Sequence, residues 1–246
     1  MRFLRLPVKD PRTVARDIPG ISEILFPGLV PGVVAYLNRT SIKINKVEEI
    51  SKKILGNVSL NAAMLYEIAY VIAEKRLDNR IVTNDECIEL AIKRQSRFFD
   101  AVKPDFISSE DIKAIESVAD NLVISMKTLA GHSPIEIAPR IAGLEWVASS
   151  EGDFAFQDTL VEVKCSGHFF SANDYRQLLI YWLLQITYVL ETNTSTWKRG
   201  ILLNPRLNKV VSFEFEVLHK LVAGGRDVIE TVELFQSVIS SARSKI

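Results

Sequence analysis

Two acidic residues and a lysine lie close together near the middle of the chain, on segments with the pattern of a β-hairpin. Two β-prone runs, residues 153–156 and 159–164, flank a polar connection of two residues, a length typical of hairpin turns. Because side chains alternate between the faces of a strand, Asp153, Glu162 and Lys164 share one face, and the apolar side chains share the other. The charged face could therefore carry chemistry.

The pairing of the two strands decides whether the carboxylates face each other. A two-residue turn pairs Phe156 with Thr159 and places Asp153 opposite Glu162, whereas a three-residue loop would separate them. Like charges at that position destabilise a sheet, so the pair requires a cation. Lys164 supplies part of the charge, and a divalent metal would supply the rest, since Mg²⁺ binds one or two carboxylates and keeps several waters. The alternative is a solvated, salt-bridged sheet surface.

The composition is that of a folded globular protein. Hydrophobic residues make up 48% of the 246 residues and charged residues 24%, which is close to ordinary usage and allows one large domain or two small ones. The 30 Lys and Arg residues balance the 30 Asp and Glu residues. Affinity for nucleic acid would therefore have to come from a local patch or a partner.

The sequence pattern favours neither secretion nor a membrane. The N-terminus has no apolar run long enough for a signal peptide, and the most apolar stretch, Leu178–Leu190, is interrupted by polar residues and predicts a buried helix. Cys87 and Cys165 form neither a disulfide framework nor a CxxC motif. We therefore expect a cytoplasmic protein with no membrane partner.

The first half of the chain is predicted to be mostly α-helical. Strong helix formers, apolar positions at three- and four-residue spacing and capping signals predict three helices. They run from about Asn61 to Lys75, from the Thr83–Glu86 capping signal to about Phe99, and from the Ser108–Asp111 capping signal to near Gly131.

After Gly131 the pattern changes to short β-prone runs around one long helix. The predicted order is a strand at Leu144–Ser149, the hairpin, a helix from about Asn173 to Glu191, and strands at Gly200–Asn204 and Lys209–Phe215. From about Val217 the chain is predicted to be helical again, with a break near Gly224 and Gly225. The sequence thus predicts an α/β or α+β core of about a hundred residues with helices before and after it.

Three short motifs follow one another across the hairpin and the helix after it. They are a Gly-Asp pair ending at Asp153, the tripeptide EVK at Glu162–Lys164, and QLLIY at Gln177–Tyr181. In this order they resemble the PD-(D/E)XK nuclease superfamily, in particular its RecB-like branch with a QxxxY helix motif. The resemblance covers about Ile141 to Phe215 and implies a restriction-endonuclease-like core sheet flanked by helices. We accordingly expect a nuclease-like domain at residues 131–246 and a mostly helical region at residues 1–130, for partner docking or dimerisation.

The resemblance implies a role for each residue of the charged face. Asp153 and Glu162 match the family's metal-binding carboxylates, the carbonyl of Val163 is expected to join them, and Lys164 matches the catalytic lysine. The implied metal is Mg²⁺ or Mn²⁺. A metal held there would lower the pKa of a bound water and help to neutralise the charge that develops on the phosphate. Lys164 would orient that water or stabilise the same charge.

The helix motif and its neighbours are further candidates. Gln177 and Tyr181 match the motif as catalytic residues, and their spacing of four places both on one helix face, toward the metal cleft. Tyr175 and Arg176 flank that face and are candidates for phosphate contact, with a plain surface role as the alternative. His168 follows the second strand closely enough to contact a nucleic-acid substrate, although a lone loop histidine usually has no catalytic part.

The chain departs from the family pattern at two places. The family's proline before the aspartate is Gly152 here, which still allows a turn into the strand. Many RecB-like enzymes also place a His or Glu on an earlier helix as a further metal ligand, and Glu145 and His132 are the candidates. Glu145 could reach the metal from the strand before Asp153, whereas His132 is better explained as a turn residue before Pro134.

These expectations combine into a Mg²⁺-dependent nuclease that hydrolyses phosphodiester bonds, with DNA favoured over RNA. The neutral net charge indicates that a protein partner directs it, such as a helicase, another subunit of a genome-defence or repair system, or a second copy of the chain. One alternative is a catalytically inactive restriction-endonuclease-like binding or assembly module. Another is a helical interaction protein whose hairpin is purely structural. Endonucleolytic and exonucleolytic cutting stay equally open.

Overall fold

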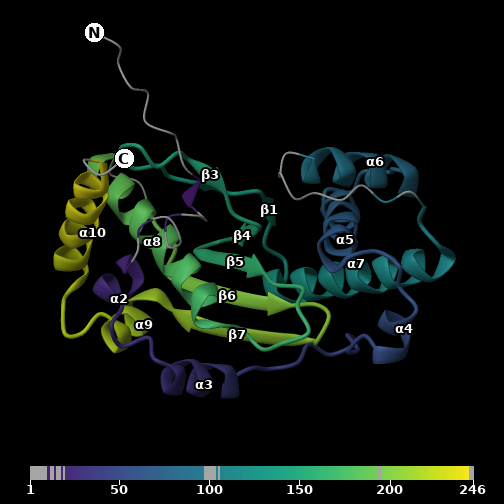
Figure 1. Ribbon diagram of the computed structural model, residues 1–246, viewed down its shortest axis with the longest axis horizontal. Coiled ribbons are helices and arrows are strands. Elements are labelled where there is room, and N and C mark those ends of the chain that lie inside the picture. The colour runs from purple at the N-terminus through teal and green to yellow at the C-terminus, as the bar shows by residue number, and fades with distance from the viewer. Residues whose placement is uncertain are drawn as a thin grey trace, which may run out of the picture.

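The computed structural model describes residues 10, 11, 14, 18, 20–96, 104, 106–192 and 195–243. Its centre is a mixed sheet of five strands in the order β1-β4-β5-β6-β7, and helices cover both faces of the sheet (Figure 1). A separate two-stranded sheet pairs β2 (Arg140–Ile141) with β3 (Ser150–Glu151). The expected mixed α/β class, with flanking helices and a helical first half, is confirmed.

The strands of the central sheet are short. They are β1 (Glu136–Ile137), β4 (Phe154–Phe156), β5 (Thr159–Val163), β6 (Arg199–Asn204) and β7 (Lys209–Glu214). β5 and β6 run parallel, and the other neighbouring pairs run antiparallel. A parallel pair needs a crossover connection, and α8 (Ala172–Thr192) provides it. The loop that leads into α8 therefore starts at the carboxyl end of a parallel strand.

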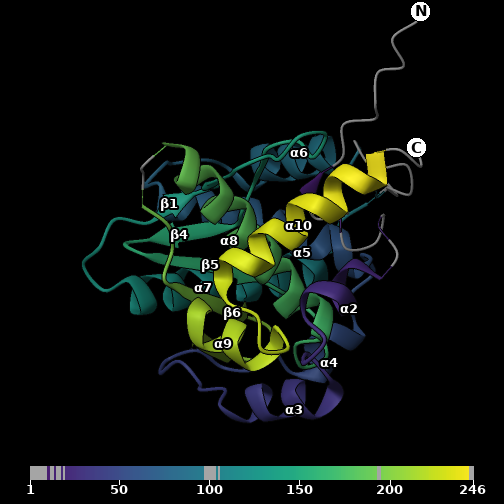
Figure 2. The ribbon, with the colours of Figure 1, turned by 90° about the vertical axis from the view of Figure 1, so that its left-hand side faces the viewer.

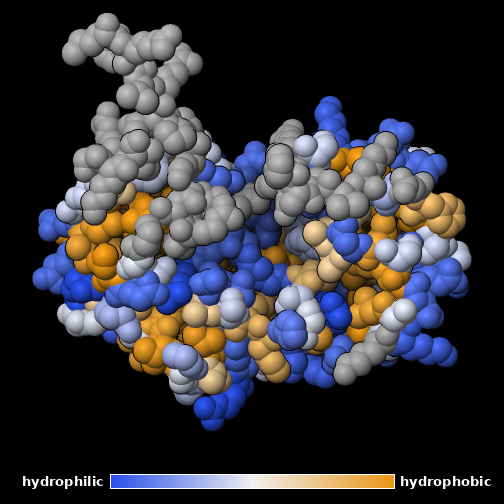
Figure 3. Space-filling view, in the orientation of Figure 1, coloured by the Kyte–Doolittle hydropathy of each residue, from blue (hydrophilic) through white to orange (hydrophobic). Residues whose placement is uncertain are grey.

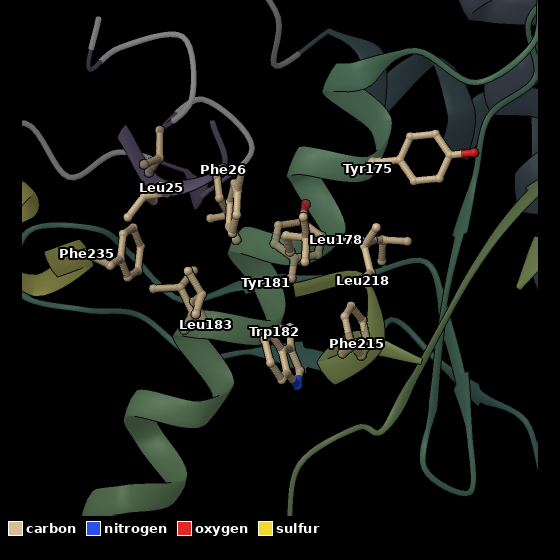
Figure 4. Close-up of a cluster of buried hydrophobic side chains, with 14 of the residues drawn as sticks. Leu25, Phe26, Tyr175, Leu178, Tyr181, Trp182, Leu183, Phe215, Leu218 and Phe235 are labelled. Carbon is tan, nitrogen blue, oxygen red and sulfur yellow. The ribbon is translucent and has the colours of Figure 1, made fainter. Parts of the chain in front are cut away.

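One face of the sheet is covered by α8, α9 (Phe215–Val222), α10 (Val228–Arg243) and α2 (Ile21–Leu25), which α3 (Pro31–Arg39) follows in the chain. Figure 2 shows α10 crossing in front of α8. Leu160 and Leu202 of the sheet share a hydrophobic cluster with apolar side chains of these helices. Within it Trp182 stacks on Phe215, with ring centroids 5.3 Å apart (Figure 4). This packing fixes α8 against the sheet.

The opposite face is covered by helices from the first half of the chain. α5 (Ala62–Leu77) and α7 (Ser109–Ala130) lie on the sheet, and α6 (Asn84–Gln95) and α4 (Lys52–Gly56) pack against them. Phe154 and Val161 of the sheet share a second hydrophobic cluster with Ile68 of α5 and Leu122 of α7, and all four are 0% exposed. The regions at residues 1–130 and 131–246 therefore share a core.

The capping signals found in the sequence start the helices. Thr83 and Ser108 form capping boxes at the starts of α6 and α7. Asn61, which was predicted as the first residue of a helix, caps α5. The predicted end of α6 near Phe99 lies outside the described residues. The predicted break between the last two helices is confirmed, since α9 ends at Val222 and α10 starts at Val228.

The strand predicted at Leu144–Ser149 is wrong. Leu144 and Val147 form only an isolated bridge around a tight turn, in which Glu145 has a φ of 53°. The indole of Trp146 donates a hydrogen bond to the carbonyl of Ile239 in α10 at 2.9 Å. The apolar residues of this segment thus anchor a turn to the helical layer instead of lining a strand.

Hydrophilic and hydrophobic side chains are mixed on the face of the molecule seen in Figure 3, and hydrophobic ones gather over α9 and α10. Val217, Leu221 and Ile229 are exposed apolar residues of these helices. Within the described part of the chain, none of the helices combines the length and the apolar character that a membrane span requires.

Candidate functional site

The hairpin of β4 and β5 has the predicted register. Phe156 pairs with Thr159, and Phe154 pairs with Val161, across a two-residue turn. Phe154 and Val161 face the cluster on the α5 side, as the alternation predicted. Glu162 is the next residue of β5 and therefore faces the opposite side, toward α8.

Asp153 lies just before β4 and is held beside the end of β5. Its Oδ2 accepts a hydrogen bond from the backbone N–H of Val163 at 2.7 Å. Its carbonyl oxygen accepts hydrogen bonds from the N–H of Ala138 at 3.0 Å and from the hydroxyl of Tyr70 at 3.1 Å. Short N–H···O⁻ bonds stabilise the charged carboxylate. A backbone N–H thus offsets part of the repulsion expected between the carboxylates of Asp153 and Glu162.

Glu162, Lys164 and Gln177 form a closed triangle of hydrogen bonds. The Nζ of Lys164 donates to Oε1 of Glu162 and to Oε1 of Gln177, each at 2.8 Å, and the Nε2 of Gln177 donates to Oε1 of Glu162 at 2.8 Å. A carboxylate oxygen of Asp174, at the start of α8, lies 3.9 Å from the same Nζ. Glu162 is only 6% exposed. The cluster is therefore not a solvated surface pair, because its acid is buried and its partners come from β5 and α8.

Tyr181 holds Gln177 from the core side. The Nε2 of Gln177 donates a second hydrogen bond to the hydroxyl of Tyr181 at 2.8 Å. Tyr181 is 1% exposed and belongs to the cluster that fixes α8 (Figure 4). Since the amide nitrogen serves Glu162 and Tyr181, the amide oxygen is the atom that faces Lys164. The spacing of four has placed both side chains on one face of α8, one behind the other.

The ammonium of Lys164 keeps its charge although its side chain is only 24% exposed. Burial alone would lower the pKa of Lys164, but attraction by the carboxylates of Glu162, Asp153 and Asp174 outweighs burial and raises this pKa above its ordinary value. Buried Glu162 in turn needs a cation, because an unpaired buried charge is strongly destabilising.

Two tyrosines of α5, which were not predicted as site residues, border the site. The rings of Tyr66 and Tyr70 lie 5.7 Å apart between centroids, and the hydroxyl of Tyr70 reaches the backbone of Asp153. Burial, and after it the charge of Asp153, raises the pKa of both hydroxyls well above the ordinary value. Both therefore keep their proton. Their spacing of four on a predicted helix was the available signal, but it did not show which helix faces the hairpin.

The other predicted metal ligands lie differently. Val163 contacts the cluster through its N–H, which binds Asp153. The carboxylate of Glu145 accepts a hydrogen bond from the hydroxyl of Ser240 in α10. Glu145 is thus not brought to the charged cluster, because the strand expected to carry it is a turn against α10. His132 is an exposed turn residue after α7.

Of the predicted nucleic-acid contacts, Tyr175 is wrong. Its ring is 0% exposed and its hydroxyl donates a hydrogen bond to Oδ1 of Asn38 at 3.1 Å, because it lies two residues before Gln177 and hence on a different face of α8. Arg176 is half-buried and pairs with a glutamate of α2 at 3.1 Å. His168 is exposed in the loop between β5 and α8.

The chemistry of the oxygen atoms at this site fits a hard cation. Mg²⁺ accepts one or two carboxylates together with waters, and Asp153 and Glu162 supply two at the end of β5. Among the described residues, no group of three or more His, Cys, Asp or Glu side chains could hold a metal ion. The chain matches no protein-family model and no curated protein. Function is therefore inferred from the geometry of Asp153, Glu162, Lys164 and Gln177.

Proposed function

We propose that this protein is a Mg²⁺-dependent nuclease of the PD-(D/E)XK type, which hydrolyses phosphodiester bonds and favours DNA over RNA. The observation that carries the proposal is the contact of Gln177, on α8, with both Glu162 and Lys164 of the β5 segment. The same three residues belong to the sequence motifs that resemble the PD-(D/E)XK superfamily. A purely structural hairpin has no need of a buried acid, lysine and amide, since apolar residues of similar volume are often as stable there.

The position of the cluster in the sheet supports the proposal. In open α/β sheets, ligands bind outside the carboxyl ends of the strands. Glu162 and Lys164 stand at the carboxyl end of β5, whose parallel neighbour β6 follows the crossover helix α8. A mixed sheet with helices on both faces also agrees with the restriction-endonuclease-like core that the resemblance implies.

Lys164, Gln177 and Tyr181 would act through contacts that are already in place, and the two carboxylates would act through a bound metal. Lys164, kept charged by its carboxylate neighbours, would counter the negative charge that develops on the phosphate or orient the attacking water. Gln177 aligns Glu162 with Lys164, and Tyr181 holds Gln177. Asp153 and Glu162 would hold Mg²⁺, which supplies a more acidic water and neutralises phosphate charge when bound.

The neutral net charge gives no general attraction to a phosphate backbone. Recognition is therefore assigned to a local surface together with a partner protein. The partner would be a helicase, another subunit of a genome-defence or repair system, or a second copy of this chain.

Incubation of the purified protein with linear, circular and single-stranded DNA and with RNA, in Mg²⁺ or in EDTA, tests the proposal. We expect cutting only with Mg²⁺, and a loss of about a hundredfold or more in Glu162→Gln and Lys164→Met. Lys113→Met, on the exposed surface of α7, is the matched control and should cut like the wild type. Equal cutting by the wild type and Lys164→Met would exclude the assigned site.

The inactive binding or assembly module is the second candidate, and the absence of a three-ligand group among the described residues is the observation that favours it. Calorimetric titration with Mn²⁺ separates the two. Saturable heat that Glu162→Gln removes would support the nuclease. A folded wild-type protein that neither cuts nor gives saturable heat would support the module.

A further inference from the structure

An exposed aromatic side chain stands in the loop between β5 and α8, five residues after Lys164. Phe169 is 55% exposed. A single exposed apolar side chain is ordinary, but the Nζ of Lys209 lies 5.4 Å from the centroid of this ring, within the range of a cation–π contact. The ring and the cation thus lie together, and the ring is close in sequence to the candidate catalytic lysine.

The loop is fixed to the turn between β6 and β7 by a buried asparagine. The side-chain amide of Asn204 donates to the carbonyls of Ser166 at 3.0 Å and His168 at 3.4 Å, and its Oδ1 accepts from the N–H of Arg206 at 3.0 Å. Asn204 is 1% exposed. The loop and the turn therefore form one unit. The side chain of Phe169 projects from a backbone that these hydrogen bonds hold in place.

That unit carries two basic residues, Arg206 and Lys209. The guanidinium of Arg206 lies against Gly167, where an added Cβ would be 3.2 Å from Nη2. Within the described residues, neither Arg206 nor Lys209 has an ion-pair partner, whereas Arg176 and Arg94 pair with glutamates. Both residues are partly exposed, so their cationic groups can contact phosphate groups.

We propose that Phe169, Lys209 and Arg206, called the loop platform here, bind single-stranded nucleic acid and lead it toward Lys164. The inference rests on the proposed function. Phe169 stacks on an unpaired base, and the two cations contact the flanking phosphates, a combination that single-strand binding proteins use. The platform supplies the local attraction that a chain of zero net charge lacks overall.

A stacking side chain selects single strands for a steric reason. Inside a duplex, neighbouring bases cover the two faces of every base, so Phe169 finds no open face there. A single strand offers one at each unstacked base. Because every base has such a face, the platform discriminates strandedness and not sequence.

Fluorescence anisotropy with a labelled oligothymidylate of about 20 nucleotides, in EDTA, measures binding apart from cutting. Phe169→Ala is expected to weaken binding by about 5- to 150-fold, and Phe169→Trp to retain it. Phe106→Ala is the matched control, because it removes a ring that is 75% exposed in the segment before α7. Its affinity should equal that of the wild type.

Lys209→Ala tests the charge independently of folding. Loss of one phosphate contact lowers the slope of log affinity against log salt by about 0.7 for a single strand, measured between about 50 and 200 mM salt. A folding defect would reduce the active fraction without changing that slope. Lys127→Ala, on the exposed end of α7, should leave it unchanged.

The outcomes separate the platform from the nuclease. If Phe169→Ala and Lys209→Ala bind the oligonucleotide like the wild type while the wild type cuts DNA, the proposed role of the loop platform is wrong and the proposed nuclease activity is retained. Equal affinity of the wild type for a duplex and a single strand also overturns the platform. A wild-type protein that binds and cuts no nucleic acid overturns both. Weaker single-strand binding in Phe169→Ala, with Mn²⁺ binding retained, supports the platform.

Discussion

Two buried carboxylates of this protein have contrasting surroundings. Asp111, at the start of α7, is 0% exposed and accepts hydrogen bonds from neutral groups. They are the backbone N–H groups of Ser59, Leu60 and Ser108 and the hydroxyls of Ser59 and Ser108. Glu162 is 6% exposed and accepts from an ammonium and a side-chain amide on two different elements. Asp111 joins two helix starts, whereas Glu162 belongs to a charged cluster at the end of a strand.

The different surroundings imply different contributions of the two acids to the free energy of unfolding. Although burial alone would raise the pKa of Asp111, hydrogen bonds from Ser59 and Ser108 lower it well below its usual range. Those donors lose their partner if the acid is removed. Glu162 forms a buried ion pair, whose net contribution to stability is often small. We therefore expect folding to depend on Asp111 and chemistry to depend on Glu162.

Asp111→Ala has the largest expected effect on folding. It leaves the backbone N–H groups of Ser59, Leu60 and Ser108 without their acceptor, so the free energy of unfolding should fall by about 3 to 5 kcal/mol. Urea denaturation measures this change, with Glu110→Ala on the exposed side of the same helix turn as the control. A loss below about 1 kcal/mol would contradict the structural role.

Glu162→Gln should show the converse behaviour. The amide is nearly isosteric with the acid, and the ammonium of Lys164 that loses its partner is 24% exposed and keeps its bond to Gln177, so the free energy of unfolding should fall by about 1 to 2 kcal/mol, less than in Asp111→Ala. Nuclease activity should fall by about a hundredfold or more. Denaturation and cleavage are measured on the same preparation. If Glu162→Gln is as destabilised as Asp111→Ala, the distinction between the two acids is lost.

The contribution of Asp111 to the free energy of unfolding should depend on pH. Its pKa is lower in the folded than in the unfolded protein, so its contribution is present above the unfolded pKa of about 3.9 and is lost as the pH falls through the folded value. The stability difference between the wild type and Asp111→Ala should therefore narrow below about pH 4. Urea denaturation at a series of pH values measures it, and a constant difference would argue against the lowered pKa.

Tyr181→Phe should have a smaller effect. It keeps the buried ring and removes one acceptor of Gln177, so we expect kcat to fall severalfold, by no more than about tenfold, with KM unchanged. Tyr36→Phe, at a residue that is 58% exposed, is the matched control. A rise in KM alone would place Tyr181 in substrate binding instead.

Glu145→Gln should have no effect on Mn²⁺ binding or cleavage, because its carboxylate is bonded to Ser240 in α10. Calorimetry and the cleavage assay both measure this. Reduced Mn²⁺ affinity would return Glu145 to the metal site.

The sequence predicted the features that depend on neighbouring residues. The capping box at Ser108 and the two-residue hairpin turn are set by a few consecutive residues. The common face of Gln177 and Tyr181 follows from the helix period alone. These features include most of the charged cluster, because Glu162 and Lys164 lie two residues apart at the end of β5 and Gln177 lies on the helix that follows.

Features that depend on distant segments were missed. The contact of Tyr70 with Asp153 requires α5 to lie against the hairpin, which no local pattern reveals. Tyr175 looked like a surface residue because its partner, Asn38, lies far away in the chain. Trp146 and its neighbours had the apolar pattern of a strand, but α10 was needed to show that they anchor a turn.

The core shared by the sheet and α5 limits how the chain can be divided. A fragment starting near residue 131 would contain every motif of the resemblance, yet it would expose Phe154 and Val161 to water and lose the hydroxyl of Tyr70. Exposed sheet faces promote aggregation. The segment that carries the motifs is therefore not a transferable module, and fusion proteins or domain exchanges should retain the helices of both halves.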